Sequence, residues 1–180
     1  MERWVLTGPP GAGKTAIANE LTRRDWFVVP EAATDVIAAL DAGDEHWKHP
    51  EFLDQIVMLQ RQRQLADPPR DVARQVFDRS PLCTLALAHY LDLTPLPALL
   101  AEVDRVIAER VYMNPVFFVS WVGFLTPTKI RRIDKAGTAR FAQVHRQVYE
   151  DHGFQLVDVP VASVDERASL VSTFILNSVR

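Results

Sequence analysis

One short segment near the start of the chain constrains the fold more than any other feature. It reads Gly8-Pro9-Pro10-Gly11-Ala12-Gly13-Lys14-Thr15, which is the spacing Gly-x-x-x-x-Gly-Lys-Thr. An apolar run at residues 4–7 precedes it, and an amphipathic run follows from Lys14. A glycine-rich turn between a strand and a helix points successive N–H groups at one centre, and the positive helix end adds to their attraction for phosphate. The segment therefore predicts a phosphate-binding Walker A loop, or P-loop.

This P-loop predicts a bound nucleoside triphosphate, ATP or GTP, together with Mg²⁺. The backbone is expected to hold the phosphates, and its residues are Gly8, Pro10, Gly11, Ala12 and Gly13. Lys14 adds a positive charge on the β and γ phosphates and is expected to be catalytic, and the Thr15 hydroxyl is expected to bind the ion. Before a ligand binds, we expect Lys14 to face solvent.

Strand-like and helix-like runs alternate along the whole chain, which favours a parallel sheet with helices on both faces. Apolar runs predict strands near residues 4–7, 27–29, 76–77, 116–121 and 154–159. Helical patterns predict helices near 14–24, 32–40, 50–66, from 81, 98–109, up to 152 and after 163. We therefore expect a three-layer α/β P-loop NTPase fold with about five mainly parallel strands. With 180 residues, the chain is expected to form a single domain over 1–180.

Composition narrows the expected partners and compartment. Hydrophobic residues make up 48% of the chain and charged residues 24%, as in soluble globular proteins. The net charge of −3 provides no general attraction for nucleic acid or an anionic membrane, so neither is an expected partner. Cys83 is the single cysteine and is interpreted as a small buried side chain. The N-terminus leaves no room for a signal peptide, and the expected compartment is the cytoplasm.

Asp78 is the candidate for the acidic partner that a P-loop needs to complete a magnesium site. It follows the apolar run at residues 76–77, and we expect that run to lie next to the P-loop strand. Asp78 and Thr15 are therefore predicted to share the ion, and Asp78 is also assigned to the catalytic set. The alternative is a carboxylate that stabilises the following helix through its dipole.

Glu31 follows the second strand-like run and is a second candidate. The carboxyl ends of strands in a doubly wound sheet meet at the crevice where ligands bind, so Glu31 should also face the phosphate site. Asp35 lies one helical turn later on the same side, and both are predicted to bind substrate. A helix N-terminal charge is again the alternative for Glu31.

A basic segment at about residues 123–140 resembles a lid. It carries Lys129, Arg131 and Arg132 between two glycines that could act as hinges, and an amphipathic helix follows. Phosphoryl transfer needs positive charge on the transferred group and exclusion of water. We therefore assign Arg131 to the catalytic set and Arg132 to nucleotide binding. A solvated charged turn is the alternative. His89, His145 and His152 lie in predicted helices without metal-ligand spacing between them.

Several short motifs together resemble a known family. They are Val5-Leu6-Thr7-Gly8 through Thr15, Val29-Pro30-Glu31-Ala32, Val76-Phe77-Asp78-Arg79-Ser80-Pro81, Arg131, Tyr149-x-x-x-Gly153-Phe154, Val159-Pro160 and Val164-Asp165-Glu166-Arg167. Over nearly the whole chain they resemble bacterial AAA-like ATPase/kinase domains, a group in which the ribosylnicotinamide kinase domain is a characterised relative. The P-loop is the most specific of these motifs.

Deoxynucleoside kinases are similar in plan. That resemblance implies that Glu31 takes the proton of the substrate hydroxyl and that Arg79 binds and orients substrate or phosphate. The chain departs from their pattern at two positions, since Asp78 stands where Glu is more usual and Ala32 follows Glu31 where Pro is more usual.

The function that these observations favour is an ATP-dependent small-molecule kinase. It would transfer the γ-phosphoryl group to a hydroxyl of a nucleoside-like or other small acceptor. Two alternatives remain, a regulatory NTPase switch that binds a protein and a drug-modifying phosphotransferase. The expected partner is the small-molecule acceptor, and a homodimer is one option for assembly.

Overall fold

The computed structural model describes residues 1–39, 50–69, 71–121 and 135–178, and within them it has one five-stranded sheet. The strands are β1 (Glu2–Thr7), β2 (Phe27–Val29), β3 (Arg74–Asp78), β4 (Val116–Val119) and β5 (Leu156–Val159). All neighbours pair in parallel, in the order β2-β3-β1-β4-β5. The predicted α/β class and parallel sheet are confirmed. The strand predicted at 116–121 corresponds to β4, which has β1 on one side and β5 on the other.

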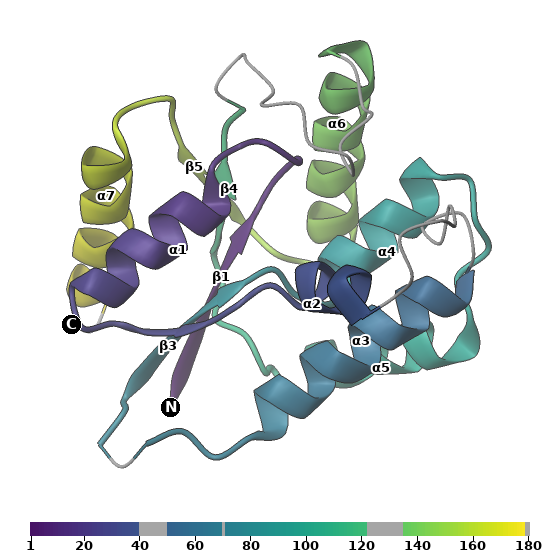
Figure 1. Ribbon diagram of the computed structural model, residues 1–180, viewed down its shortest axis with the longest axis horizontal. Coiled ribbons are helices and arrows are strands. Elements are labelled where there is room, and N and C mark those ends of the chain that lie inside the picture. The colour runs from purple at the N-terminus through teal and green to yellow at the C-terminus, as the bar shows by residue number, and fades with distance from the viewer. Residues whose placement is uncertain (40–49, 70, 122–134, 179–180) are drawn as a thin grey trace.

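The helices of the described residues cover both faces of the sheet (Figure 1). They are α1 (Lys14–Arg23), α2 (Ala32–Ala39), α3 (Pro50–Leu65), α4 (Pro81–Tyr90), α5 (Pro97–Ala108), α6 (Lys135–Asp151) and α7 (Val164–Asn177). Figure 1 shows α1 and α7 side by side on one face, with α3, α4, α5 and α6 on the other. None of these helices is long and apolar enough to cross a bilayer.

The alternation of side chains along β1 divides the core into two layers. Trp4 and Leu6 pack into the cluster under α1 and α7, and Val5 packs into the larger cluster under the other helices. This follows from strand geometry, because successive side chains point to opposite faces. Both faces of β1 are therefore buried, as expected for the central strand of a parallel sheet.

Two helix ends carry the predicted local signals in different ways. At α7, Ser163 and Glu166 form the predicted capping box, with each side chain bonded to the other's backbone N–H at 3.2 and 2.9 Å. At α4, Ser80 occupies the N-cap position before Pro81, but its side chain makes no cap hydrogen bond. The Ser80 hydroxyl is instead hydrogen-bonded to the Tyr149 hydroxyl of α6, so it joins two helices rather than capping α4.

Candidate active site

The predicted P-loop is a tight turn between β1 and α1. Gly8 and Gly13 have φ values of 129° and 87°, which residues with side chains rarely adopt. A Cβ atom on Gly8 would lie 2.6 Å from the carbonyl oxygen of Val119 on β4. Glycine is thus required at position 8 both for conformation and for space, and the loop has the shape that its sequence predicts.

Lys14 is buried in this structure, contrary to the expectation that it faces solvent. The residue is 4% exposed, and Nζ donates to the carbonyl oxygens of Gly8 and Pro9 at 3.0 and 2.8 Å. Burial, and next the charge of Arg79, lower the pKa of Lys14 to about 7, although Asp78 opposes the shift. The Lys14 amine is therefore bonded to the backbone of the P-loop itself. To bind a phosphate, it would have to exchange these two carbonyl oxygens for phosphate oxygens.

Asp78 lies at the end of β3, which pairs directly with β1 as predicted. Thr15 Oγ1 donates to Asp78 Oδ2 at 2.9 Å, so the structure brings the two predicted magnesium ligands together. Asp78 Oδ1 is buried and, among the described residues, has no hydrogen-bond partner. Burial raises the pKa of Asp78, and the charges of Lys14 and Arg79 act against that rise. A cation at this carboxylate would satisfy the unpaired oxygen and hold the group ionised.

The Thr15 and Asp78 oxygens fit the coordination preferences of Mg²⁺. This ion usually takes one or two carboxylates from the protein and completes its shell with water and substrate phosphates. No group of three or more His, Cys, Asp or Glu side chains in the described parts of the chain is arranged to hold a metal ion. A site for an ion that depends on nucleotide phosphates would consist of few protein ligands, as this one does.

Glu31 and Arg79 form an ion pair between the ends of β2 and β3. Arg79 has a positive φ of 80°, and its N–H donates to the carbonyl oxygen of Leu6 at 3.0 Å. Such a conformation costs a non-glycine residue of order 1–3 kcal/mol and is found mostly at functional sites. The strained backbone and the bond to β1 thus hold Arg79 at the edge of the sheet beside the P-loop.

The charge state of Glu31 is set by two opposing effects. Burial disfavours its ionised form, but the charges of Arg79 and Lys14 and the hydrogen bonds from Arg79 and Thr34 outweigh burial and lower the pKa. The Thr34 hydroxyl donates to Glu31 Oε2 at 3.1 Å. Glu31 is therefore an ionised carboxylate at neutral pH, within the electrostatic field of the P-loop lysine.

The structure places Asp35 on a more exposed surface than Glu31. Its side chain is 56% exposed and pairs with Arg63 of α3, and the Arg63 guanidinium also donates to the carbonyl oxygen of Pro30 at 2.9 Å. Through Arg63, Asp35 is connected to the backbone of Pro30, the residue before Glu31. The sequence pattern placed Asp35 one helical turn after Glu31 on the same side, but it contained no signal for this partner from another helix.

A small enclosed cavity lies between α3 and the ends of β2 and β3. Its lining consists of Val29, Pro30, Gln60, Arg63, Phe77, Asp78, Arg79 and Tyr112. Its volume of about 10 Å³ has room for a single water. A molecule bound beside Arg79 and Asp78 on this side would therefore have to displace α3 side chains or bind above the cavity.

Buried hydroxyl and thiol groups connect the P-loop strand to α6. Tyr149 OH lies 2.6 Å from Ser80 Oγ and 3.2 Å from Cys83 Sγ, and Thr7 Oγ1 lies 3.2 Å from the same sulfur. Cys83 is buried, as the sequence predicts, and serves as the centre of this network. Through it, α6 is fixed against the residues that flank Arg79 and Gly8.

Arg131, Arg132 and Lys129 lie outside the described residues, as does most of the lid predicted at 123–140. The C-terminal part of that segment forms the beginning of α6. The roles assigned to these three residues stay predictions.

Sequence reasoning assigned no role at the site to three side chains, Arg63, Tyr149 and His145. His145 is fully buried, and the charges of Arg79 and Lys14 act on its ring. Its only signal in the sequence is a position one helical turn before Tyr149, which belongs to a motif already singled out.

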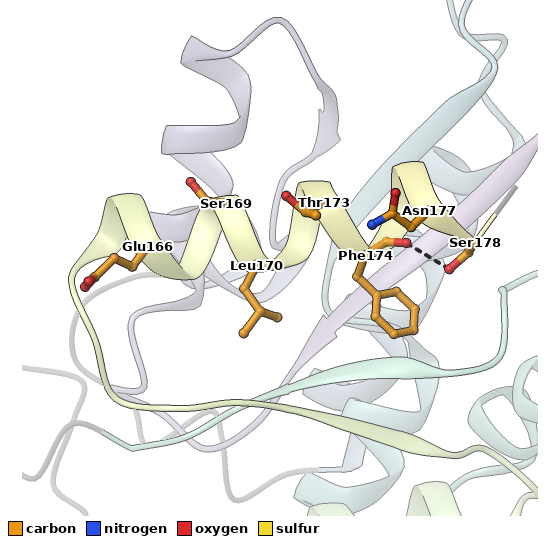
Figure 2. Close-up of a pocket in the computed structure, with 7 residues that line it drawn as sticks. All are labelled: Glu166, Ser169, Leu170, Thr173, Phe174, Asn177 and Ser178. Atoms are coloured by element: carbon orange, nitrogen blue, oxygen red, sulfur yellow. Dashed lines mark hydrogen bonds between the residues drawn. The ribbon is translucent and has the colours of Figure 1, made fainter.

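A hollow along one side of α7 is separate from all the predicted site residues (Figure 2). Leu170 and Phe174 project from the same side of the helix, and the Ser178 hydroxyl donates to the carbonyl oxygen of Phe174 at 2.9 Å. It is an open groove along one helix, without the convergent charged groups found at the P-loop.

Comparison with protein families identifies the chain. The model of the AAA domain family matches residues 3–167, so the chain belongs to this family. No curated protein matches the sequence.

Solved structures with the same fold include NadR and two kinases. NadR in complex with NAD and AMP-PNP is 11% identical with a TM-score of 0.68, and the match covers 96% of this chain but 48% of NadR. Thymidylate kinase from Ehrlichia chaffeensis is 12% identical with a TM-score of 0.64, over 97% and 98% of the two chains. Deoxyadenosine kinase from M. mycoides is 13% identical with a TM-score of 0.55, over 98% and 100%. The chain thus has a P-loop kinase-like fold and spans about half the length of NadR.

Proposed function

We propose that this AAA-domain protein is an ATP-dependent kinase that transfers the γ-phosphoryl group to a hydroxyl of a small, nucleoside-like acceptor. The observation that carries the proposal is the position of the Glu31–Arg79 ion pair. It lies at the sheet edge that carries the P-loop, because Arg79 directly follows Asp78 at the end of β3, and β3 pairs with β1 on one side and with β2 on the other. A nucleotide held by the P-loop would therefore present its terminal phosphate to a carboxylate and a guanidinium from neighbouring strands.

Each of these residues has a distinct role in the proposed transfer. Lys14 and the P-loop backbone hold the phosphates, while Thr15 and Asp78 hold Mg²⁺, which when bound neutralises charge on the β and γ phosphates. Arg131 and Arg132 of the predicted lid would add positive charge to the transferred phosphate.

Glu31 accepts the proton of the attacking hydroxyl, or holds that hydroxyl in line with the phosphorus. In a loose transition state proton removal is late, so positioning contributes more than basicity. Arg79 keeps Glu31 ionised and orients the acceptor. Asp35, with Arg63, would lie at the outer edge of the acceptor region.

Two observations support these roles. One is the kinase fold of the similar structures, and the other is the pair of carboxylates in the cluster. Glu31 and Asp78 are separate carboxylates with opposite pKa shifts, lowered in Glu31 and raised in Asp78. A hydrolytic switch would use such a second carboxylate to orient the attacking water, so Glu31 has a role in either reaction. The acceptor-dependence of turnover is what distinguishes the kinase from the switch.

The test is a screen for acceptors in an assay of ADP formation from Mg²⁺·ATP. Ribonucleosides, deoxynucleosides, polyols and amino alcohols are added singly, and ³¹P NMR identifies any phosphorylated product. The proposal expects at least one acceptor to raise ADP formation well above the rate in buffer, with product in equal amount. Equal rates with and without every acceptor, together with phosphate release, would indicate the NTPase switch instead.

A further inference from the structure

Two cationic side chains, and no others, are buried in the part of the chain that the structure describes. They are Lys14, which is 4% exposed, and Arg167 in the first turn of α7, which is 3% exposed. Neither forms an ion pair with a described carboxylate, although a buried charge without a partner is costly. By contrast, the buried carboxylates Glu20 and Glu102 each pair with arginine side chains. The unpaired charge of Arg167 therefore needs a physical reason.

The guanidinium of Arg167 lies against the P-loop. Its Nη1 is 3.1 Å from the point that a Cβ atom on Gly13 would occupy, so even a methyl group at position 13 would crowd it. Its Nη2 donates to the carbonyl oxygen of Ser120, directly after β4, at 3.0 Å. These two contacts place the charge between the P-loop and the end of β4, the strand that pairs with β1. A second buried cation thus adjoins the loop that contains Lys14.

The acidic residues beside Arg167 in α7 have other partners. Asp165 pairs with Arg24, and Glu166 accepts from the backbone of Ser163 in the capping box. Arg167 Nε is buried without a hydrogen-bond partner among the described residues, and burial lowers the pKa of the guanidinium. Arginine nevertheless stays protonated in proteins at neutral pH. A positive charge therefore remains beside the P-loop, and none of the described side chains compensates it by an ion pair.

An anion bound at the P-loop would be the counter-charge that Arg167 lacks. The backbone N–H groups of a Walker A loop, that of Gly13 among them, are expected to bind phosphate. Electrostatic attraction needs no direct contact: at about 10 Å and an effective dielectric constant of about 20, two opposite unit charges change an equilibrium constant about 15-fold. Arg167 can therefore act on a bound phosphate while its own atoms stay buried.

We propose that Arg167 is a positioning residue for the nucleotide phosphates: from α7 it supplies a second buried positive charge beside the P-loop, which the bound phosphates compensate. The inference rests on the nucleotide binding in the proposed function, and it holds for phosphoryl transfer and for hydrolysis alike. Because the charge acts through the loop, its effect grows with the negative charge of the ligand. A triphosphate should gain more than a diphosphate, and an uncharged nucleoside should gain nothing.

Two variants of Arg167 separate its charge from its packing. Arg167→Met removes the charge and keeps an unbranched apolar chain, whereas Arg167→Lys keeps the charge. Arg24→Met is the matched control, because Arg24 also connects α1 to α7 but its charge is paired with Glu20 and Asp165. Calorimetry without any acceptor gives the Kd of Mg²⁺·ATP and of Mg²⁺·ADP, and circular dichroism gives the Tm.

For Arg167→Met we expect the Kd of Mg²⁺·ATP to rise about 5- to 20-fold, and that of Mg²⁺·ADP, which carries less negative charge, to rise less. Arg167→Lys should recover most of the affinity. Arg24→Met should lower the Tm, because Glu20 and Asp165 lose their partner, and should leave both Kd values at about the wild-type level.

The dependence of the Kd on KCl concentration distinguishes a charge from a packing contact. Salt screens electrostatic attraction, so the Kd of Mg²⁺·ATP should rise less steeply with KCl in Arg167→Met than in wild type or Arg167→Lys. A packing defect would raise the Kd by the same factor at every KCl concentration. Equal losses in the two Arg167 variants, with the salt dependence of wild type, would overturn the proposal.

A measurement on the unmodified protein covers the case in which the Arg167 variants do not fold. The Nε–H resonance of Arg167 is followed in ¹⁵N-arginine-labelled protein with Mg²⁺·AMP-PNP or adenosine added. We expect Mg²⁺·AMP-PNP to shift this resonance and adenosine to leave it unchanged. A resonance that does not move at saturating Mg²⁺·AMP-PNP would overturn the proposal.

The outcomes separate this proposal from the proposed function. If wild type and folded Arg167→Met bind ATP equally well, the role of Arg167 is overturned and the kinase function stands. If Arg167→Met loses affinity but wild type phosphorylates no acceptor, the role of Arg167 is supported and the kinase function is not. Wild-type protein that binds no nucleotide would contradict both.

Discussion

The two sides of the candidate site are built in different ways. The phosphate side is one continuous segment, Gly8 to Thr15, whose backbone shape follows from its glycines. The acceptor side is assembled from Glu31 after β2 and Arg79 after β3. The backbone N–H groups of the P-loop can bind the phosphates of any nucleotide. The side chains of the acceptor side can be substituted one at a time, which would change the acceptor that is bound. The comparison predicts that changes on the two sides affect different kinetic quantities.

The largest effect is expected on the acceptor side, for Glu31→Gln. Glutamine keeps the size of the side chain but can neither take a proton nor pair fully with Arg79. Removing such a group typically lowers the rate by about 10²–10⁴-fold. We expect that loss in phosphoryl transfer with nearly unchanged affinity for ATP, measured by acceptor-dependent ADP formation and by calorimetry.

Glu2→Gln is the matched control for Glu31→Gln. Glu2 also pairs with an arginine, Arg74, but at the opposite end of the sheet. This control should retain full activity. Full transfer activity in Glu31→Gln, with activity lost in Asp35→Asn, would move the base to another carboxylate.

Asp78→Asn should have the next largest effect and sharpens the boundary between the two sides. Asparagine can still accept the hydrogen bond from Thr15, but it removes the charge that would hold Mg²⁺. Removing one group that stabilises transition-state charge typically lowers turnover about 10²–10³-fold, and we expect a loss of that size here. ATP affinity should fall much less, and a titration of ADP formation with Mg²⁺ should show a higher requirement for the ion. An unchanged magnesium dependence would remove Asp78 from the metal site.

Lys14→Met tests the phosphate side alone. Methionine keeps the chain length of the buried part while removing the charged donor. The loss of about 3 kcal/mol from hydrogen bonds to a charged group corresponds to about 100-fold weaker ATP binding. Calorimetry should show this loss in a protein with an unchanged circular dichroism spectrum, and Arg74→Ala should bind ATP normally. Unchanged ATP affinity in folded Lys14→Met would refute the P-loop assignment.

The smallest effect is a proton taken up when ATP binds. Lys14 has a pKa of about 7 in the free protein, so it is mostly neutral at pH 8.5. Phosphates favour its charged form and raise the pKa again, so binding at pH 8.5 should take up close to one proton, and binding at pH 6 close to none. Calorimetry in buffers of different ionisation enthalpy measures the uptake, with Lys14→Met as the background. Equal uptake in Lys14→Met and wild type would show that Lys14 is already charged before binding.

The phosphate side was predictable from sequence because each of its signals is local. Glycines at fixed spacing specify the turn, and the apolar run and helical pattern on either side specify its context. Even here one property was predicted incorrectly. Lys14 was expected to face solvent, but its amine turns back onto the carbonyls of Gly8 and Pro9, a contact that depends on the folded loop rather than on residue type.

The acceptor side was predictable in outline only. The position of Glu31 and Asp78 at strand ends implied that they meet, because parallel strands end at one edge of the sheet. The pairing of Asp35 with Arg63 and the bond between Ser80 and Tyr149 join helices that are distant in sequence. Periodicity indicates which face of a helix is buried but not which residue lies opposite, so these contacts had no signal in the sequence.

The most direct test of the two-sided site is a crystal structure with Mg²⁺ and a non-hydrolysable ATP analogue. We predict that Lys14 Nζ leaves the carbonyl oxygens of Gly8 and Pro9 for the β and γ phosphates, and that Asp78 lies in the first or second coordination shell of the ion. Glu31 should remain paired with Arg79, facing the terminal phosphate without binding the metal. A structure in which Glu31 binds the ion and Asp78 lies remote from it would contradict the assignment of phosphate and acceptor sides.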